Sequence, residues 1–258
     1  ALSGGSTLDF DAQSLALYDS EAPHFDLTYF DAPLAEIEKM LPGDEPLYQR
    51  VEAFNRQFEI PADKLSIVFN RAIKECSDRS KVFITLADNE NFDLEYVKNK
   101  SWGGYNWYKG NANSLIQVNT DFPIALSRAV VLGCHEGYPG HHAYNSMLED
   151  ELVNKRGWIE YTVYPLYSPQ SLIAEGSANY GVTMAFPGDE KATFEKEVLY
   201  PLAGIDPALS DKFQKYHKLT EKLGYVDNEI ARLYINGDID KEKAITLIQK
   251  YRMLTRAK

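Results

Sequence analysis

The segment VLGCHEGYPGHHAYNSMLEDEL, residues 131–152, holds three of the five histidines of the chain. His135, His141 and His142 fall within eight residues, and Glu136 directly follows the first of them. The run before them is apolar, so burying these ionisable side chains would be costly unless each has a polar partner or a bound metal. The segment therefore predicts a helix that carries a metal site.

The spacing of these histidines departs from H-E-x-x-H, in which histidines at i and i+4 share a helix face and bind zinc. Here the second histidine comes six or seven residues after His135. On an unbroken helix, i+6 points about 120° away and i+7 returns to within about 20°, which favours His142. Pro139 and Gly140 disfavour an unbroken helix, and a local bulge would restore His141 to the i+4 role. Both histidines therefore stay open as the second ligand.

A third ligand is expected from SLIAEGSANYGVTMAF, residues 171–186, which has a helical pattern. Glu175 lies among small and apolar residues, so we expect it to be buried and hence paired, protonated or bound to a metal. It follows His135 by 40 residues, a distance that suits a second helix returning past the first. Two histidines and a glutamate on antiparallel helices would make a zinc site with an open position for water.

The remaining sequence predicts a mostly helical α+β fold with one small antiparallel sheet before the active-site helix. Residues 1–45 are polar and broken by prolines and glycines, which indicates loop with short helical pieces. Short β-branched or aromatic runs bounded by Asn and Gly predict strands at 81–88, 92–99, 103–110 and 114–120. Apolar residues at helical spacing predict helices at 45–59, 61–81, 122–136, 171–185, 189–203, 207–223, 226–236 and 240–254.

The composition bounds the class of protein. With 258 residues, 44% of them hydrophobic, the chain can bury a core as one large domain or two joined lobes. A formal net charge of -11 repels phosphate backbones, so we expect no nucleic-acid partner. No apolar run reaches the length of a membrane span, and no signal-peptide pattern is present. The chain starts at Ala1, which indicates a mature, trimmed or partial chain and leaves the compartment open, with an extracytoplasmic one favoured.

The two cysteines, Cys76 and Cys134, are too few for a disulfide framework, and their spacing matches no cysteine-rich zinc module. We expect both to be small core residues. Cys134 directly precedes His135, and neighbours on a helix are turned about 100° apart, so it is a poor candidate for a ligand.

These motifs resemble a known family. HEGYPGHH resembles the H-E-x-x-P-G-H-H signature of the bacterial domain-of-unknown-function 885 family, which is grouped with gluzincin-type zinc metallopeptidases. AEGSANYG is similar to the later E-G-x-A-x-Y segment of the family and to the third-ligand helix of aminopeptidase-N-like enzymes. GYNWYKGNANSLIQVNTDFP resembles the segment before the active-site helix. The likeness runs from about Gly103 to Tyr180, and members of the family are typically much longer.

The resemblance implies a zinc metallopeptidase that acts on a peptide or small amide. Its zinc ligands would be His135, Glu175 and one of His141 or His142, with Glu136 as general base. Comparing PGHHAY with the GHAL that ends ordinary gluzincin motifs favours His141. The fold expected is a gluzincin-like core over 81–258 with a helical tail, after an N-terminal segment over 1–80, or one continuous domain. The alternatives are a zinc amidase on a non-protein substrate and an inactive, metal-stabilised binding domain.

Several other residues are candidates for supporting roles. Asn145 and Asn179 would orient ligands, with Asn179 one helical turn past Glu175. NSLIQVNT is either an edge strand able to pair with a peptide or an interior strand. Gly103 and Gly104 form a turn or permit close backbone approach. Donors to a developing oxyanion are expected among Tyr144, Tyr161, Tyr164, Tyr167, Tyr180 and Tyr225.

Overall fold

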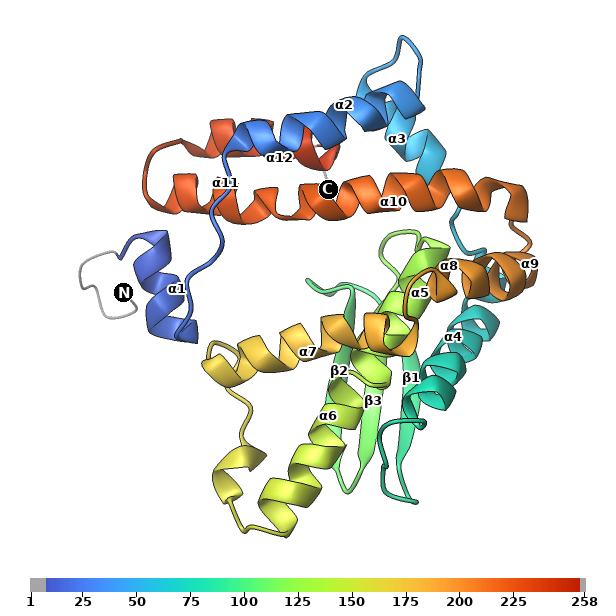
Figure 1. Ribbon diagram of the computed structural model, residues 1–258, viewed down its shortest axis with the longest axis vertical. Coiled ribbons are helices and arrows are strands. Elements are labelled where there is room, and N and C mark those ends of the chain that lie inside the picture. Colours follow the sequence, from blue (N-terminus) through green and yellow to red (C-terminus); the bar gives the residue numbers. More distant parts are fainter. Residues whose placement is uncertain (1–7, 256–258) are drawn as a thin grey trace. The chain divides into compact units, whose positions relative to one another are not determined.

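The computed structural model describes residues 8–255 and shows a mostly helical α+β protein with a small sheet (Figure 1). Contacts divide the chain into two compact units. The first unit comprises residues 1–57, 167–169 and 208–258, and the second comprises 58–166 and 170–207. This division is not the sequential one expected at residue 80, because the C-terminal helices group with the N-terminal ones.

The first unit is helical. Its core includes Phe30, Ile37, Leu223 and Val226, all fully buried. The segment expected to be loop with short helical pieces contains two helices of nine and ten residues, and its first seven residues lie outside the described part of the chain. The elements are α1 (Phe10–Tyr18), η1 (Leu27–Phe30), α2 (Asp31–Met40), α3 (Leu47–Arg56), α10 (Ser210–Gly224), α11 (Val226–Ile235) and α12 (Lys241–Arg252).

The second unit contains a three-stranded sheet of β1 (Asn91–Val97), β2 (Gly104–Gly110) and β3 (Asn113–Asn119) in the order β1-β3-β2. β2 and β3 are antiparallel, but β1 runs parallel to β3, so the sheet is mixed and the expectation of an antiparallel sheet was wrong. β3 is the most buried of the three strands and takes the centre, whereas β1 lies at an edge and its residues are half-buried or exposed. NSLIQVNT is therefore interior. The run at 81–88 forms no strand and begins with a turn after α4.

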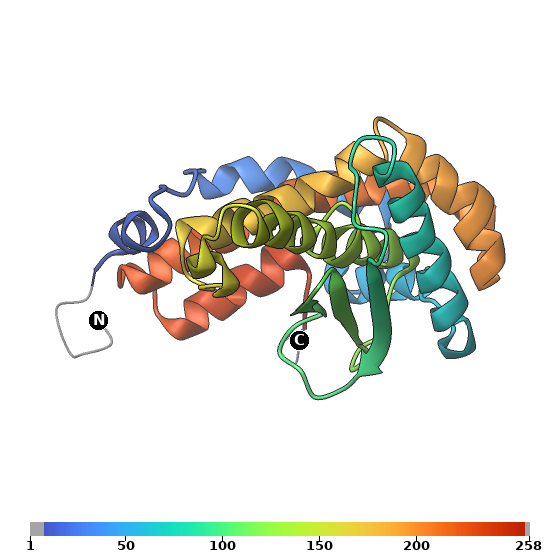
Figure 2. The same cartoon turned by 90° about the horizontal axis from the view of Figure 1, so that it is seen from below.

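One face of the sheet is covered by helices (Figure 2). Alternate residues of β3, namely Ser114, Ile116 and Val118, are buried beneath them, as the two-residue period of a strand requires. The covering elements include α4 (Leu65–Ser80), α5 (Leu126–Leu132), the π-helical turn η3 (Gly133–Gly137) and α6 (His141–Leu148). The expected helix over 122–136 is thus shorter, and it widens into η3 where the histidines begin.

The rest of the second unit consists of α7 and several shorter elements. The helix expected over 189–203 is present as α8, η6 and α9, the last of which ends at Gly204 with φ of 75°. The elements are α7 (Pro169–Ala185), α8 (Glu190–Phe194), η6 (Glu195–Leu199), α9 (Tyr200–Ala203), η2 (Ala62–Lys64), η4 (Glu149–Asn154) and η5 (Ile159–Thr162). The chain passes from the second unit to the first within η7 (Pro207–Leu209).

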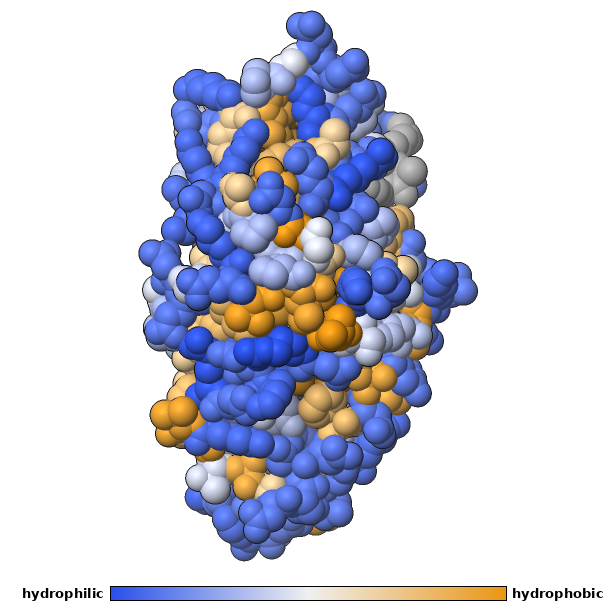
Figure 3. Space-filling model, turned by 90° about the vertical axis from the view of Figure 1, so that its right-hand side faces the viewer, coloured by the Kyte–Doolittle hydropathy of each residue, from blue (hydrophilic) through white to orange (hydrophobic). Residues whose placement is uncertain are grey.

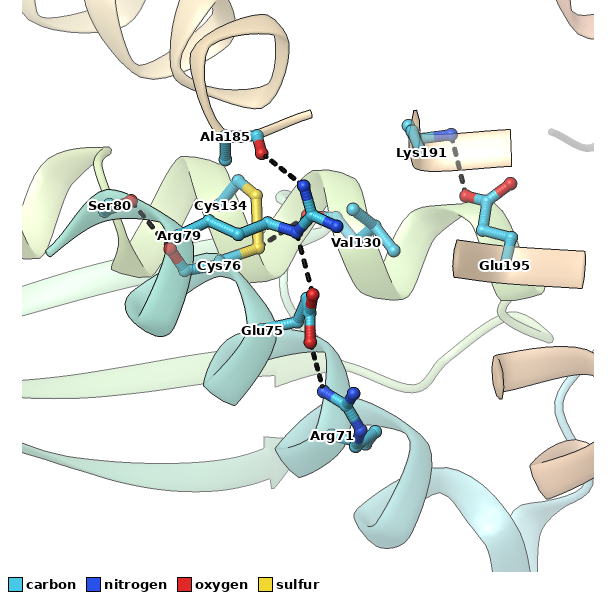
Figure 4. The surroundings of a disulfide bond; sticks show 10 residues. All are labelled: Arg71, Glu75, Cys76, Arg79, Ser80, Val130, Cys134, Ala185, Lys191 and Glu195. Carbon is cyan, nitrogen blue, oxygen red and sulfur yellow. Dashed lines mark hydrogen bonds and ion pairs between the residues drawn. A yellow bond between two sulfur atoms is a disulfide. The ribbon is translucent and has the colours of Figure 1, made fainter. Parts of the chain in front are cut away.

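A disulfide joins Cys76 of α4 to Cys134 of η3, with a Cα–Cα distance of 5.3 Å (Figure 4). Both cysteines are fully buried core residues, as expected, and the bond between them was not predicted. Arg79, one turn along α4, donates to the Ala185 carbonyl at the end of α7 over 3.2 Å (Figure 4). α4 therefore braces both the histidine-bearing turn and the helix that carries Glu175.

Replacing both cysteines with serine should lower the free energy of unfolding by about 4 kcal/mol. The bond closes a loop of 58 residues, and the chain-entropy relation gives that magnitude for a loop of this length. Urea unfolding followed by circular dichroism measures the change. A reductant should destabilise the wild type and leave the double-serine variant unchanged. Two reactive thiols in the unfolded, unreduced wild type would contradict the pairing.

The surface seen in Figure 3 is mostly hydrophilic. On the face seen in Figure 3, hydrophilic residues surround separate apolar patches. Within residues 8–255, no helix combines the length and apolar content that crossing a bilayer needs.

Candidate metal centre

A tight turn after η3 sets the position of the second histidine. The Gly140 amide donates to the Cys134 carbonyl over 2.9 Å, and α6 begins at the next residue. A Cβ added at Gly140 would lie 1.9 Å from the His135 carbonyl oxygen, so only glycine fits. The chain thus folds back on itself, and the rings of His135 and His141 meet edge to face with centroids 4.7 Å apart.

Small residues on one face of α7 let this helix approach the turn closely. Ala174, Ala178 and Gly181 are buried, and a Cβ added at Gly181 would lie 2.9 Å from Pro139. Glu175 projects from the same helix toward both histidine rings. Its side chain is 51% exposed, so the expectation that it is buried was wrong. The small residues around it serve helix packing and do not enclose the carboxylate.

His135, His141 and Glu175 form a group that could hold a metal ion. The Nε2 atoms of His135 and His141 lie 3.3 Å and 3.2 Å from the two carboxylate oxygens of Glu175. One ligand atom from each residue lies within 4.8 Å of the others. Hydrogen bonds from His135 and His141 hold the pKa of Glu175 well below its usual range. Burial lowers the pKa of His135, but its bond to Glu175 and the charge of Glu136 outweigh this and raise the pKa overall.

The structure places His142 away from this group. Its Nδ1 lies 2.8 Å from the Ser114 hydroxyl, and its Nε2 lies 3.2 Å from Glu90. The side chain is 0% exposed, and burial lowers its pKa. The helical-phase argument for His142 assumed an unbroken helix, which the turn at Gly140 interrupts. His142 instead joins α6 to β3 and to the loop before β1.

Glu136 lies beside the three-residue group but outside it. Its Oε1 is 4.0 Å from Nε2 of His135, and the residue is 4% exposed. Burial raises its pKa, against the opposing charges of His135 and His141. A Cβ at Gly104 would lie 3.1 Å from Glu136 Oε1, so this glycine permits close approach of β2 to the carboxylate.

Two asparagines support the first histidine turn. Asn179 Oδ1 lies 3.1 Å from Nδ1 of His135, so Asn179 is a partner of a histidine, one of the two roles expected for it. Asn106 of β2 donates from Nδ2 to the Glu136 carbonyl over 2.7 Å, and its Oδ1 is buried without a hydrogen bond. Sequence reasoning missed Asn106; its only signal was a polar residue at an inward position of a strand. Asn145 lines the cleft described next.

The group opens into a cleft of about 550 Å³. One wall is the whole of β2, and the other includes η4, Tyr161 and Tyr164. Of the six tyrosines expected as donors, these two line the cleft, and the Tyr164 hydroxyl bonds Ser171 over 3.2 Å. Burial raises the pKa of Tyr164, and the charge of Glu175 adds to this. The volume is in the range typical of small-ligand and peptide sites.

Comparison with known proteins gives a structural match but no family or curated relative. No family model matches the chain, and no curated protein matches it. A solved structure described as "the putative lipoprotein from Colwellia psychrerythraea" matches with a TM-score of 0.64 and 17% sequence identity. The match covers 96% of this chain and 43% of that one, so the chain spans less than half of the matched protein. At this identity the likeness concerns the fold alone.

Proposed function

We propose that the protein is a zinc-dependent hydrolase, a metallopeptidase of the gluzincin type. The observation that carries the proposal is the meeting of His135, His141 and Glu175 beside the buried Glu136 at the floor of a cleft. A structural zinc has four protein ligands and no need of a base, whereas a catalytic zinc has three protein ligands and an open position. Three candidate ligands with a fourth, non-ligating carboxylate fit the catalytic kind.

The donor set suits zinc. Two imidazole nitrogens and a carboxylate are ligands that zinc binds in hydrolases. A histidine that binds a metal through one ring nitrogen usually has a hydrogen-bond partner on the other. Asn179 is that partner for Nδ1 of His135, and it fixes the ring with Nε2 toward Glu175 and His141. When bound, zinc would lower the pKa of a water molecule and polarise a substrate carbonyl.

The residues of the chain would do the proton transfers. Glu136 would accept a proton from the attacking water and pass it to the leaving amine. Its raised pKa makes it a stronger proton acceptor than a solvated carboxylate. The Tyr164 hydroxyl, beside Glu175 in the same cleft, would donate to the oxyanion.

The substrate would bind along β2. This strand pairs with β3 on one side, and its other edge lines the cleft. An extended peptide can add to an open strand edge through main-chain hydrogen bonds, which bind with little demand on sequence. We expected NSLIQVNT to pair with a peptide if it were an edge strand; because β3 is central, the neighbouring edge strand β2 would pair with the peptide instead.

We further propose, on HEGYPGHH and AEGSANYG, that the protein belongs to the domain-of-unknown-function 885 family, and that it lies in an extracytoplasmic compartment. The disulfide supports that compartment, because such bonds persist mainly in oxidising environments. The lipoprotein description of the matched structure points the same way.

Zinc removal tests the proposal. Protein stripped with a chelator should lose hydrolysis of a peptide panel and regain it with one equivalent of zinc, because the attacking water depends on the metal. Product formation is followed by mass spectrometry, with peptides of free and blocked termini and small acyl amides in parallel. Unchanged hydrolysis by zinc-free protein would contradict the proposal. Cleavage of the small amides alone would indicate an amidase, and zinc binding without hydrolysis would indicate a binding domain.

A further inference from the structure

An arginine stands at one end of the β2 edge. Arg128 projects from α5, and its Nη2 would lie 3.0 Å from a Cβ built on Gly103, the residue before β2. One residue further, a Cβ on Gly104 would lie 3.1 Å from Oε1 of Glu136. Consecutive Cα atoms are about 3.8 Å apart, so the guanidinium and the proposed base flank adjacent residues at the start of the strand. The charge of Glu136 acts on Arg128 at this separation.

This guanidinium has no partner of its own in the part of the chain that the structure describes. Arg128 is exposed, and its side chain makes no hydrogen bond or ion pair within residues 8–255. Most other arginines in that range pair with a carboxylate, as Arg71 does with Glu75 and Arg79 with Glu190. In a chain of net charge -11, an arginine left unpaired beside a cleft is available to an anion from outside.

The direction in which a peptide pairs with β2 would decide which of its termini meets Arg128. β2 runs from Gly104 to Gly110, so a peptide paired antiparallel with it would run from the Gly110 end to the Gly104 end and bring its C-terminus toward Arg128. A parallel peptide would bring its amino terminus there, and two positive charges would repel. At about 3.4 Å per residue, a terminal carboxylate near Arg128 lies roughly one to three residues beyond a bond held at Glu136.

We infer that Arg128 binds the C-terminal carboxylate of the substrate, so that the site releases short fragments from the C-terminal end of peptides. The inference rests on the proposed peptidase function and adds its substrate class: chains that end in a free carboxylate shortly after the cleaved bond. Arg128 thus acts as a specificity residue, and a planar guanidinium suits a carboxylate because it donates two parallel hydrogen bonds.

Matched peptides test the inference. Acetylated hexapeptides without acidic residues are supplied as free acids and as carboxamides to the zinc-loaded protein. The wild type should cleave the acids with kcat/KM about 10- to 100-fold higher, as expected for a charge-assisted hydrogen bond. Arg128→Ala should remove that difference by slowing the acids alone, and Arg128→Lys should keep part of it. The matched control is Arg56→Ala, a surface arginine paired with Glu52, which should preserve the difference.

The contrary outcomes are distinct. Equal cleavage of acids and amides by the wild type, or an equal loss for both in Arg128→Ala, would overturn the inference and leave the peptidase proposal in place. A carboxamide with glutamate at its last position, cleaved as well as the acid, would show side-chain recognition and overturn the terminal assignment. Fragments cut far from the C-terminus would do the same.

Binding provides a second measurement that needs no turnover. The Glu136→Gln protein, loaded with zinc, is titrated with the same acids and amides by calorimetry. The acids should bind about 10- to 100-fold tighter, and adding Arg128→Ala should abolish the preference. If the wild type cleaves nothing, the peptidase proposal fails, and this preference alone decides the role of Arg128. Equal binding of the two peptide forms would overturn that role.

Discussion

Replacing Glu136 with glutamine should lower peptide hydrolysis by about 10²- to 10⁴-fold while the protein keeps its zinc, because a positioned general base contributes a factor of that size. Glutamine has nearly the same shape and keeps the buried position, but it cannot accept the proton of the attacking water. Glu136 lies outside the group of His135, His141 and Glu175, so the metal should remain. Initial rates on a zinc-dependent peptide and zinc content by elemental analysis measure the two effects.

The control for this change is Glu151→Gln. Glu151 is an exposed glutamate of η4 that pairs with Lys155, and its loss should alter neither rate nor zinc content. Undiminished turnover in Glu136→Gln would remove Glu136 as the base. Loss of zinc from that variant would instead make Glu136 a ligand and overturn the assigned set.

Replacing His141 with alanine should reduce zinc from close to one per chain to near zero, and His135→Ala and Glu175→Ala should do the same. Three protein ligands are the minimum of a catalytic site, so the loss of any one removes a large part of its affinity. His142→Gln should retain zinc, because the ring of His142 contacts Ser114 and Glu90 instead. His142→Gln should instead lower the free energy of unfolding by about 1–3 kcal/mol, because buried polar groups lose their hydrogen-bond partner.

Zinc content per folded chain distinguishes His141 from His142 as the ligand. The control is His24→Ala, because His24 is distant from the metal group in the sequence and its side chain is 61% exposed. Zinc retained by His141→Ala and lost by a folded His142→Gln protein would reverse the assignment. Thermal unfolding of each variant, with and without added zinc, shows whether a loss of metal reflects the site or the fold.

The sequence predicted the residues of the candidate site and most helices, but it did not predict how the strands pair. Residue type and local order were enough to single out His135 and Glu136, because clustered ionisable groups in apolar surroundings need a partner. Glu175 was singled out by an expected burial that the structure does not show. Helical periodicity located most helices for the same local reason. The strand at 81–88 failed because an apolar run alone does not supply a neighbouring strand to pair with.

Long-range packing decided the remainder. The order of the strands did not follow from their composition, since β1 has more apolar residues than β3 and yet lies at the edge of the sheet. The disulfide required two cysteines 58 residues apart in the sequence to meet. Both facts concern pairs of distant segments, about which local pattern says nothing.

The sequence HEGYPGHH by itself determined that this protein carries a histidine-rich turn suited to a metal, since the residue types and the Pro-Gly break are local properties. Only the tertiary structure decided which of His141 and His142 lies with His135 and Glu175. The turn at Gly140 interrupts the helix, so angular position along one helix no longer applies. The approach of α7 through its small residues then brings Glu175 to His141, while β3 and Glu90 take His142.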